Sequence, residues 1–144
     1  MYTEKVMEHF RHPRNVGRIE EPSGMARVGD PSCGDSIELY IKVESDRIVD
    51  IKYMIYGCPA SIATSSVTSE IVKGKTIDEA LSITDDDVIR ALGGLPENKG
   101  HCSLLSITAL HYALNDYFLK EELKGDAEGM RERADRGLHK PFLP

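Results

Sequence analysis

The sequence predicts an α+β fold: a three-stranded antiparallel sheet with helices packed on one face, and a long C-terminal helix. Two observations lead to this prediction. Apolar and polar residues alternate in two successive runs, over residues 36–43 and 49–55, as they do in half-buried strands. From Pro59 onward the apolar spacing becomes helical, so the helices follow the sheet instead of alternating with its strands. Segregation of that kind is typical of α+β proteins.

The first expected elements are a short helix and a short strand. Residues 3–11 predict the helix, because their apolar positions recur at helical spacing and the segment HPRN then ends it; these positions are Val6, Met7 and Phe10. A stretch rich in proline, glycine and serine covers residues 13–24. After it, Met25 to Val28 are expected to form a short strand.

The two alternating runs predict an antiparallel hairpin. The first run places four aliphatic residues on one face, namely Ile37, Leu39, Ile41 and Val43. The polar segment ESDR follows, and the second run then places its own apolar residues on one face, namely Val49, Ile51, Tyr53 and Ile55. Two such runs joined by a short polar loop are typical of a β-hairpin.

Helices are expected over the rest of the chain. Proline at position 59 suits the first residue of a helix, whose inner stripe would be Ala60, Ala63, Val67 and Ile71. TIDEA and TDDDV each begin with threonine followed by acidic residues, which predicts two short capped helices. The last helix is expected from about His101 to Leu123, with a core stripe of Leu104, Ile107, Leu110, Leu114 and Phe118.

Length and charge limit the possible functions. We expect one folded domain over residues 1–123, and a charged C-terminal extension over residues 124–144 that is peripheral or partly disordered. The net charge of −6 argues against binding to nucleic acid or to an anionic membrane. The first residues lack the apolar core of a signal peptide. Three cysteines without a CxxC pair suit a reducing compartment, so we expect a cytoplasmic protein.

The three cysteines are far apart in sequence, but the predicted elements bring them together. If the hairpin turn is centred between Ser45 and Asp46, Cys33 and Cys58 lie opposite each other just beyond the open end of the strand pair. Cys58 also directly precedes a predicted helix, and Cys102 lies in the first turn of the last one. Because a helix N-terminus favours thiolate over thiol, we expect three activated sulfurs to converge.

Two further residues can complete a metal site. Asp35 follows Cys33 by two positions, and His101 directly precedes Cys102. Each residue also has a structural interpretation: a cysteine is often an ordinary buried side chain, Asp35 could cap a turn, and His101 could be a polar residue of a helix start. Three thiolates with one oxygen or nitrogen ligand suit Zn²⁺ and also a [2Fe–2S] cluster. Incomplete cysteine ligation indicates a cluster that is passed on.

Five blocks of the chain carry a family resemblance: YTEKVMEHFRHPRNVG, GDPSCGD, YGCPASIATSS, VKGKTIDEA and LPENKGHCSLL. In this order they resemble the iron–sulfur cluster assembly scaffolds of the IscU/NifU N-terminal type, and the resemblance extends from Tyr2 to about Lys120. It implies a single-domain scaffold with a three-stranded sheet covered by helices. Such a protein receives sulfur from a cysteine desulfurase, combines it with iron, and passes a labile [2Fe–2S] cluster to acceptor apo-proteins.

The resemblance also implies the ligands and partners. The cluster ligands would be Cys33, Cys58 and Cys102, with Asp35 or His101 as the variable fourth. Zn²⁺ is the alternative occupant of the same site, and a homodimer of the cluster-loaded protein is compatible with the sequence. Many bacterial members carry an LPPVK-like loop that an Hsp70-type chaperone grips. Here it reads LPENK, and the missing second proline argues against that partner.

Two other functions compete with a scaffold, which is a binding and transfer protein and not an enzyme. One is a zinc-dependent sulfur acceptor of a cysteine desulfurase, related to the scaffolds, although that branch typically has an insertion between the second and third cysteines. The other is a Cys/His hydrolase built on Cys102 and His101. Neighbouring residues of one helix rarely align a nucleophile with its base, which makes this function the weakest of the three.

Overall fold

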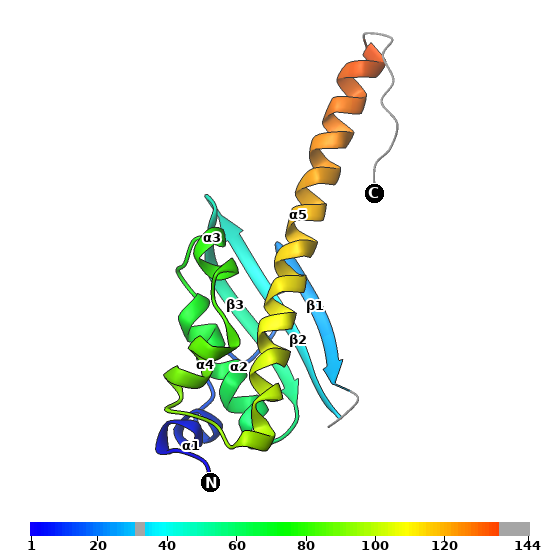
Figure 1. Ribbon diagram of the computed structural model, residues 1–144. Helices are drawn as coiled ribbons and strands as arrows, with labels where there is room; N and C mark the ends of the chain where they lie inside the picture. Colours follow the sequence, from blue (N-terminus) through cyan, green and yellow to red (C-terminus); the bar gives the residue numbers. More distant parts are fainter. Residues whose placement is uncertain (31–33, 136–144) are drawn as a thin grey trace.

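A three-stranded antiparallel sheet forms the centre of the molecule, as predicted. The computed structural model describes residues 1–30 and 34–135 (Figure 1). The strands lie in the order in which they occur along the chain: β1 (Gly24–Asp30), β2 (Asp35–Glu44) and β3 (Arg47–Tyr56). Helices α2 (Pro59–Val72) and α5 (His101–Asp135) cover the same face of this sheet (Figure 1). The α+β class and the helices on one face are therefore confirmed.

The β2–β3 hairpin confirms the predicted pairing close to its turn. Ser45 and Asp46 have φ angles of 51° and 64°, the left-handed conformation that a two-residue hairpin turn of this kind requires. One step further along, the register shifts between Lys42 and Val43 because β3 contains one extra residue there. A bulge of this kind moves every later pair of the ladder by one position.

The bulge corrects one part of the sequence prediction. Ile48 and Ile51 are both fully buried, whereas Val49, which we expected on the inner face, is 38% exposed. Strict alternation places residues 49 and 51 on one side, and the extra residue breaks that alternation between them. The register that aligned Cys33 with Cys58 therefore holds only as far as the bulge. Cys33 itself lies outside the described residues.

The shorter helices form where their capping residues predict them. Thr3 caps α1 (Glu4–Arg11) with its side chain. Thr76 and Thr84 form capping boxes with acidic residues at the starts of α3 (Ile77–Leu81) and α4 (Asp85–Ala91). A single 3₁₀ turn, η1 (Glu97–Lys99), then leads into α5. Helix α1 precedes the sheet, and α3, α4 and η1 connect α2 to α5.

Helix α5 is longer than predicted, and its expected core stripe is confirmed in part, since Ile107, Leu110 and Leu114 are buried. It continues to Asp135, past the expected end at Leu123, and projects beyond the sheet (Figure 1). Residues 124–135 of the predicted charged extension therefore belong to this helix, and residues 136–144 lie outside the described part of the chain. Leu104 and Phe118, which we expected in the core, are 50% and 42% exposed.

Small residues share the inner face of α5 with larger ones. Ala109 and Ala113 are buried there, together with Leu105, Leu110 and Leu114. The alanines leave room for the helix to approach β1 closely. At Gly24 the carbonyl oxygen of Ala113 lies where a Cβ atom would stand, so only glycine fits this position of the strand.

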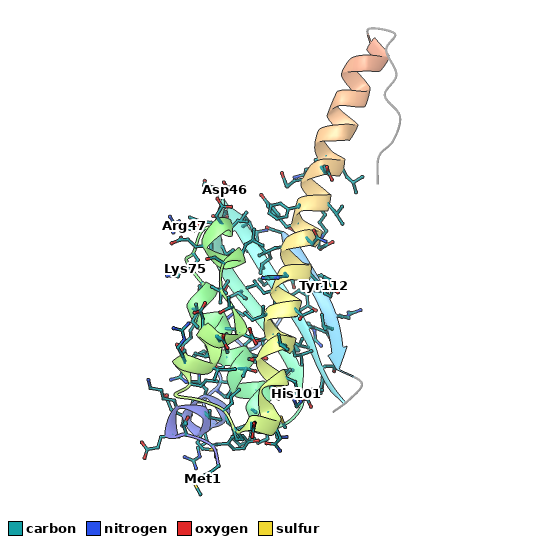
Figure 2. The ribbon with its side chains drawn as sticks, viewed as in Figure 1. Met1, Asp46, Arg47, Lys75, His101 and Tyr112 are labelled. Atoms are coloured by element: carbon teal, nitrogen blue, oxygen red, sulfur yellow. The ribbon has the colours of Figure 1, made fainter. Side chains whose placement is uncertain are left out.

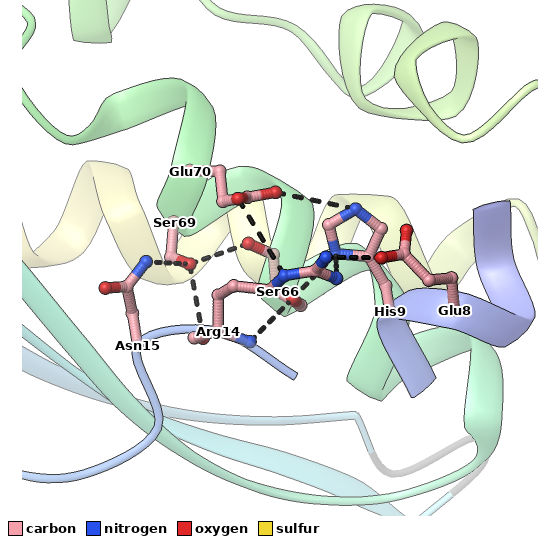
Figure 3. Close-up of polar contacts among 7 residues, drawn as sticks. All are labelled: Glu8, His9, Arg14, Asn15, Ser66, Ser69 and Glu70. Atoms are coloured by element: carbon pink, nitrogen blue, oxygen red, sulfur yellow. Dashed lines mark hydrogen bonds and ion pairs between the residues drawn. The ribbon is translucent and has the colours of Figure 1, made fainter. Parts of the chain in front are cut away.

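Helix α1 is joined to α2 by a group of polar residues that we call the His9 network: Glu8, His9, Arg14, Asn15, Ser66, Ser69 and Glu70 (Figure 3). The Nδ1 atom of His9 lies 2.7 Å from the Ser66 hydroxyl, and its Nε2 atom lies 3.5 Å from a carboxylate oxygen of Glu70. The backbone N–H of Arg14 donates to the same Ser66 hydroxyl over 3.0 Å. Burial lowers the pKa of His9, and the Arg14 charge adds to that shift.

Among the described residues, no helix combines the length and the apolar composition that crossing a membrane would require.

Candidate metal centre

Asp35 supplies the carboxylate of the candidate centre. It is the first residue of β2, and its side chain is buried. Gly57, at the end of β3, makes room for it. A Cβ atom at this glycine would overlap the Asp35 carboxylate and the hydroxyl of Ser61. Glycine at position 57 therefore lets the strand end, the carboxylate and the first turn of α2 pack against one another.

Cys58 stands between β3 and α2, at the N-cap position of the helix. Its extended backbone places the thiol before the first turn, and Pro59 then begins the helix. The sulfur lies 3.7 Å from an oxygen of Asp35 and 3.7 Å from the sulfur of Cys102. Cys58 is partly exposed, so this side of the centre is open to solvent.

Cys102, the second residue of α5, is more deeply placed. Cys102 is only 1% exposed. Burial raises the pKa of its thiol to about 12, and negative charge on Cys58 contributes further. We expected a thiolate activated by the helix N-terminus, and burial acts on the pKa of Cys102 in the opposite direction. A metal ion that binds here has to displace the thiol proton.

His101 adjoins the centre from one side. Figure 2 labels it at the start of α5, near the end of the sheet where β2 begins and β3 ends. Its Nε2 atom lies 3.7 Å from the sulfur of Cys102. Lys99 brings positive charge to the same place. Its pKa is raised, chiefly by negative charge on Cys58 and then by Tyr2, with smaller effects from Cys102 and Asp35.

The described part of the chain therefore brings three of the predicted ligands together. Ligand atoms of Asp35, Cys58 and Cys102 all lie within 4.8 Å of one another. His101 lies beside Cys102 but outside that group of three. Cys33, the remaining candidate, is among the residues that the structure does not describe. Sequence reasoning missed Lys99, whose only signal is its position two residues before His101.

The donor set decides which metals suit the centre. Thiolate sulfurs favour Zn²⁺ and iron in iron–sulfur clusters, and a carboxylate or imidazole completes a four-coordinate set. Fold and site together define a class: an α+β protein with a candidate metal centre that combines two cysteine sulfurs, each at a helix start, with a carboxylate at a strand end.

Comparison with known proteins identifies the family. Residues 1–124 match the family model described as the NifU-like N terminal domain. This coverage shows that the chain belongs to the NifU-like N-terminal domain family, which confirms the resemblance noted in the sequence.

Individual relatives agree with this assignment. The chain is 57% identical over 120 residues to iron–sulfur cluster assembly scaffold protein IscU 1 of Archaeoglobus fulgidus, covering 83% of this chain and 78% of that protein. It is 46% identical over 122 residues to the IscU scaffold protein of Aquifex aeolicus, with the same coverage of 83% and 78%. A crystal structure from Fervidobacterium islandicum, of a protein proposed as the assembly scaffold of the SUF system, superposes with a TM-score of 0.65 at 28% identity. That match covers 78% of this chain and 96% of the other.

Proposed function

We propose that this protein is a scaffold on which iron and sulfide are assembled into a labile [2Fe–2S] cluster, which is then passed to acceptor apo-proteins. One observation carries the proposal: Asp35, Cys58 and Cys102 come from three separate elements and place their ligand atoms within 4.8 Å of one another. The relatives described above are named as iron–sulfur cluster assembly scaffold proteins, which supports the same role here.

The ligand set of the proposed cluster extends beyond the described residues. Cys33 would supply a third thiolate, two positions before Asp35 in the chain. The fourth ligand would be Asp35 or His101, since both lie beside a cysteine of the centre. A carboxylate is a harder ligand than a thiolate and binds iron of a cluster less tightly. A cluster with one such ligand, on the open side near Cys58, is suited to transfer.

Transfer requires a sulfur donor and an acceptor. Sulfur would come from a cysteine desulfurase, and acceptor apo-proteins would take the finished cluster. Two copies of the chain could share one cluster, which would make the loaded form a homodimer. The loop LPENK, over residues 95–99, argues against an Hsp70-type chaperone as a further partner. A cytoplasmic, reducing environment would keep the three cysteines available as ligands.

Anaerobic reconstitution tests this proposal. The full chain is incubated with ferrous iron, L-cysteine and a cysteine desulfurase, and the visible spectrum is followed while iron and acid-labile sulfide are counted. We expect sulfide-to-iron absorption and equal amounts of iron and sulfide. Tight binding of Zn²⁺ without any such absorption would contradict a cluster scaffold.

A zinc-dependent sulfur acceptor is the second candidate function, because the same sulfur and oxygen donors suit tetrahedral Zn²⁺. In that case Zn²⁺-loaded protein would strongly stimulate a cysteine desulfurase and accept its sulfur, and no cluster would form. The desulfurase rate with Zn²⁺-loaded protein, measured alongside the reconstitution, separates the two functions.

A further inference from the structure

Two hydroxyl side chains of α2 connect the backbone of Cys58 to the backbone of Cys102. The hydroxyl of Ser61 donates to the carbonyl oxygen of Cys58 over 2.8 Å. The hydroxyl of Thr64 lies 3.0 Å from the carbonyl oxygen of Ser61 and 3.1 Å from that of Cys102. These contacts form a continuous relay from one cysteine of the centre to the other.

We infer that Thr64 is a positioning residue that fixes Cys102 relative to Cys58. Its hydroxyl has one proton and lies between two carbonyl acceptors, one on its own helix and one on α5. Thr64 is fully buried, so water does not compete for either acceptor. A buried hydrogen bond of this kind holds its partners in one geometry more firmly than an exposed one.

The position of Cys102 in α5 explains why such an anchor is needed. The residue lies in the first turn of the helix, directly after a 3₁₀ turn and Gly100. Helix ends fray more readily than helix interiors, so the backbone at Cys102 has less support from its own helix than later residues have. Thr64 supplies that support from α2, the helix that begins next to Cys58.

One turn further along α2, a similar contact involves no cysteine of the centre. Thr68, also fully buried, places its hydroxyl 3.0 Å from the hydroxyl of Ser106 on α5. Thr64 and Thr68 therefore make comparable contacts between the same two helices, but only Thr64 contacts a cysteine of the centre. Thr68 is a matched control for every structural effect of losing one threonine hydroxyl.

The consequence of this anchor is a metal site with a preset spacing between its sulfurs. Metal–sulfur bonds tolerate only small deviations in length, so a shift of Cys102 relative to Cys58 weakens metal binding. Groups that orient metal ligands without touching the metal typically change metal affinity by about 10–100-fold when they are removed. Thr64 would contribute in this way to any thiophilic metal at the centre, and its effect on the cluster rests on the proposed function.

Three variants of the full chain test the inference: Thr64→Val, Thr64→Ser and Thr68→Val. Co²⁺ alone is the probe, because its sulfur-to-metal and visible ligand-field bands report the geometry of the site directly. We expect Thr64→Val to weaken Co²⁺ binding about tenfold and to shift these bands. Thr64→Ser, which keeps the hydroxyl, should restore both affinity and spectrum, and Thr68→Val should leave both unchanged while losing a similar amount of thermal stability.

Equal Co²⁺ affinities and spectra for Thr64→Val and Thr68→Val would overturn the inference. If Thr64→Val fails to fold, Thr64→Ala compared with Thr64→Ser isolates the same hydroxyl, and equal affinities and spectra in these two variants would overturn it equally. Absence of Co²⁺ binding by the unaltered protein would instead contradict the metal centre itself, so the two failures are distinguishable. With the reconstituted cluster, the cluster lifetimes of the same variants should follow the order of their Co²⁺ affinities.

Discussion

Two polar clusters lie beside α2, the His9 network and the metal centre, and they differ in how completely their side chains are paired. In the His9 network, the histidine and serine atoms lie 2.7 Å apart, and the Arg14 backbone N–H donates to the same serine over 3.0 Å. In the metal centre, each sulfur contact is 3.7 Å long. The first cluster satisfies its own hydrogen-bonding groups, whereas the second holds metal-binding atoms near one another without strong bonds between them.

This difference shows why composition alone does not identify a functional site. Ser66, His9 and Glu70 follow one another as the groups of a hydrolytic triad do (Figure 3). Ser66 is nevertheless fully buried, and its oxygen accepts the N–H of Arg14. A buried and fully paired hydroxyl stabilises the fold. The centre at Cys58 is partly exposed and its donors are weakly paired, which suits the binding and release of a metal.

The largest expected effect comes from removing a sulfur of the centre. In Cys102→Ser, Zn²⁺ affinity should fall on the order of a hundredfold or more, since the roughly 10–16 kcal/mol of a structural zinc site is shared among four ligands. Isothermal titration with Zn²⁺ measures the loss. Ser66→Ala is the matched variant in the other cluster and should bind Zn²⁺ normally. Equal loss of affinity in both variants would remove the distinction between the two clusters.

For the free energy of unfolding, in contrast, we expect the larger loss from a change in the His9 network. Ser66→Ala leaves a buried nitrogen of His9 and the N–H of Arg14 without their shared partner, which we expect to lower the free energy of unfolding by about 1–3 kcal/mol. Denaturant unfolding of the metal-free protein gives this value. Ser82→Ala, at an exposed serine, is the control and should change the free energy by less than about 0.5 kcal/mol. A Ser66→Ala variant as stable as that control would show that the network contributes little.

The smallest expected effect is on the pH dependence of stability. Because the pKa of His9 is lowered by folding from its ordinary value of 6.5, the unfolded chain binds the histidine proton first as the pH falls. The contribution of neutral His9 is therefore fully present above pH 6.5 and is lost as the pH falls from there through the folded-state pKa. Unfolding free energies of metal-free protein, measured from neutral pH to about pH 5, should decline less steeply in His9→Gln. Identical slopes would contradict this role of His9.

The sequence predicted the elements well and their faces less well. Alternation over residues 36–43 and 49–55 predicted the hairpin. Because Ile48 and Val49 are both β-branched, nothing in the pattern indicated that β3 contains the extra residue of the bulge. On α5, most of the predicted stripe is buried, but Leu104 and Leu105 are equally apolar neighbours, and the pattern selected the exposed one. Close approach of the helix to β1 selects small residues such as Ala113, which apolar spacing alone does not rank highly.

For the site, too, the sequence predicted which residues take part but not their surroundings. Its residue types and their placement at the ends of elements predicted that Asp35, Cys58 and Cys102 would meet. The burial that raises the pKa of Cys102 could not be predicted in this way, because it depends on how α5 packs. The contacts of Thr64 could not be predicted from the sequence either. A threonine in a run of small hydroxylated residues shows its partner only when both helices are in place.

In the proposed scaffold, the centre releases its cluster because a carboxylate, Asp35, stands where a further thiolate would bind iron more tightly. Transfer of reconstituted clusters to apo-ferredoxin tests this role most directly, comparing the unaltered protein with Asp35→Cys and with Asp86→Cys, the same exchange at an exposed carboxylate. We expect the Asp35→Cys cluster to persist several-fold longer and to transfer correspondingly more slowly, with Asp86→Cys unchanged. Equal lifetimes and transfer rates in all three proteins would contradict the claim.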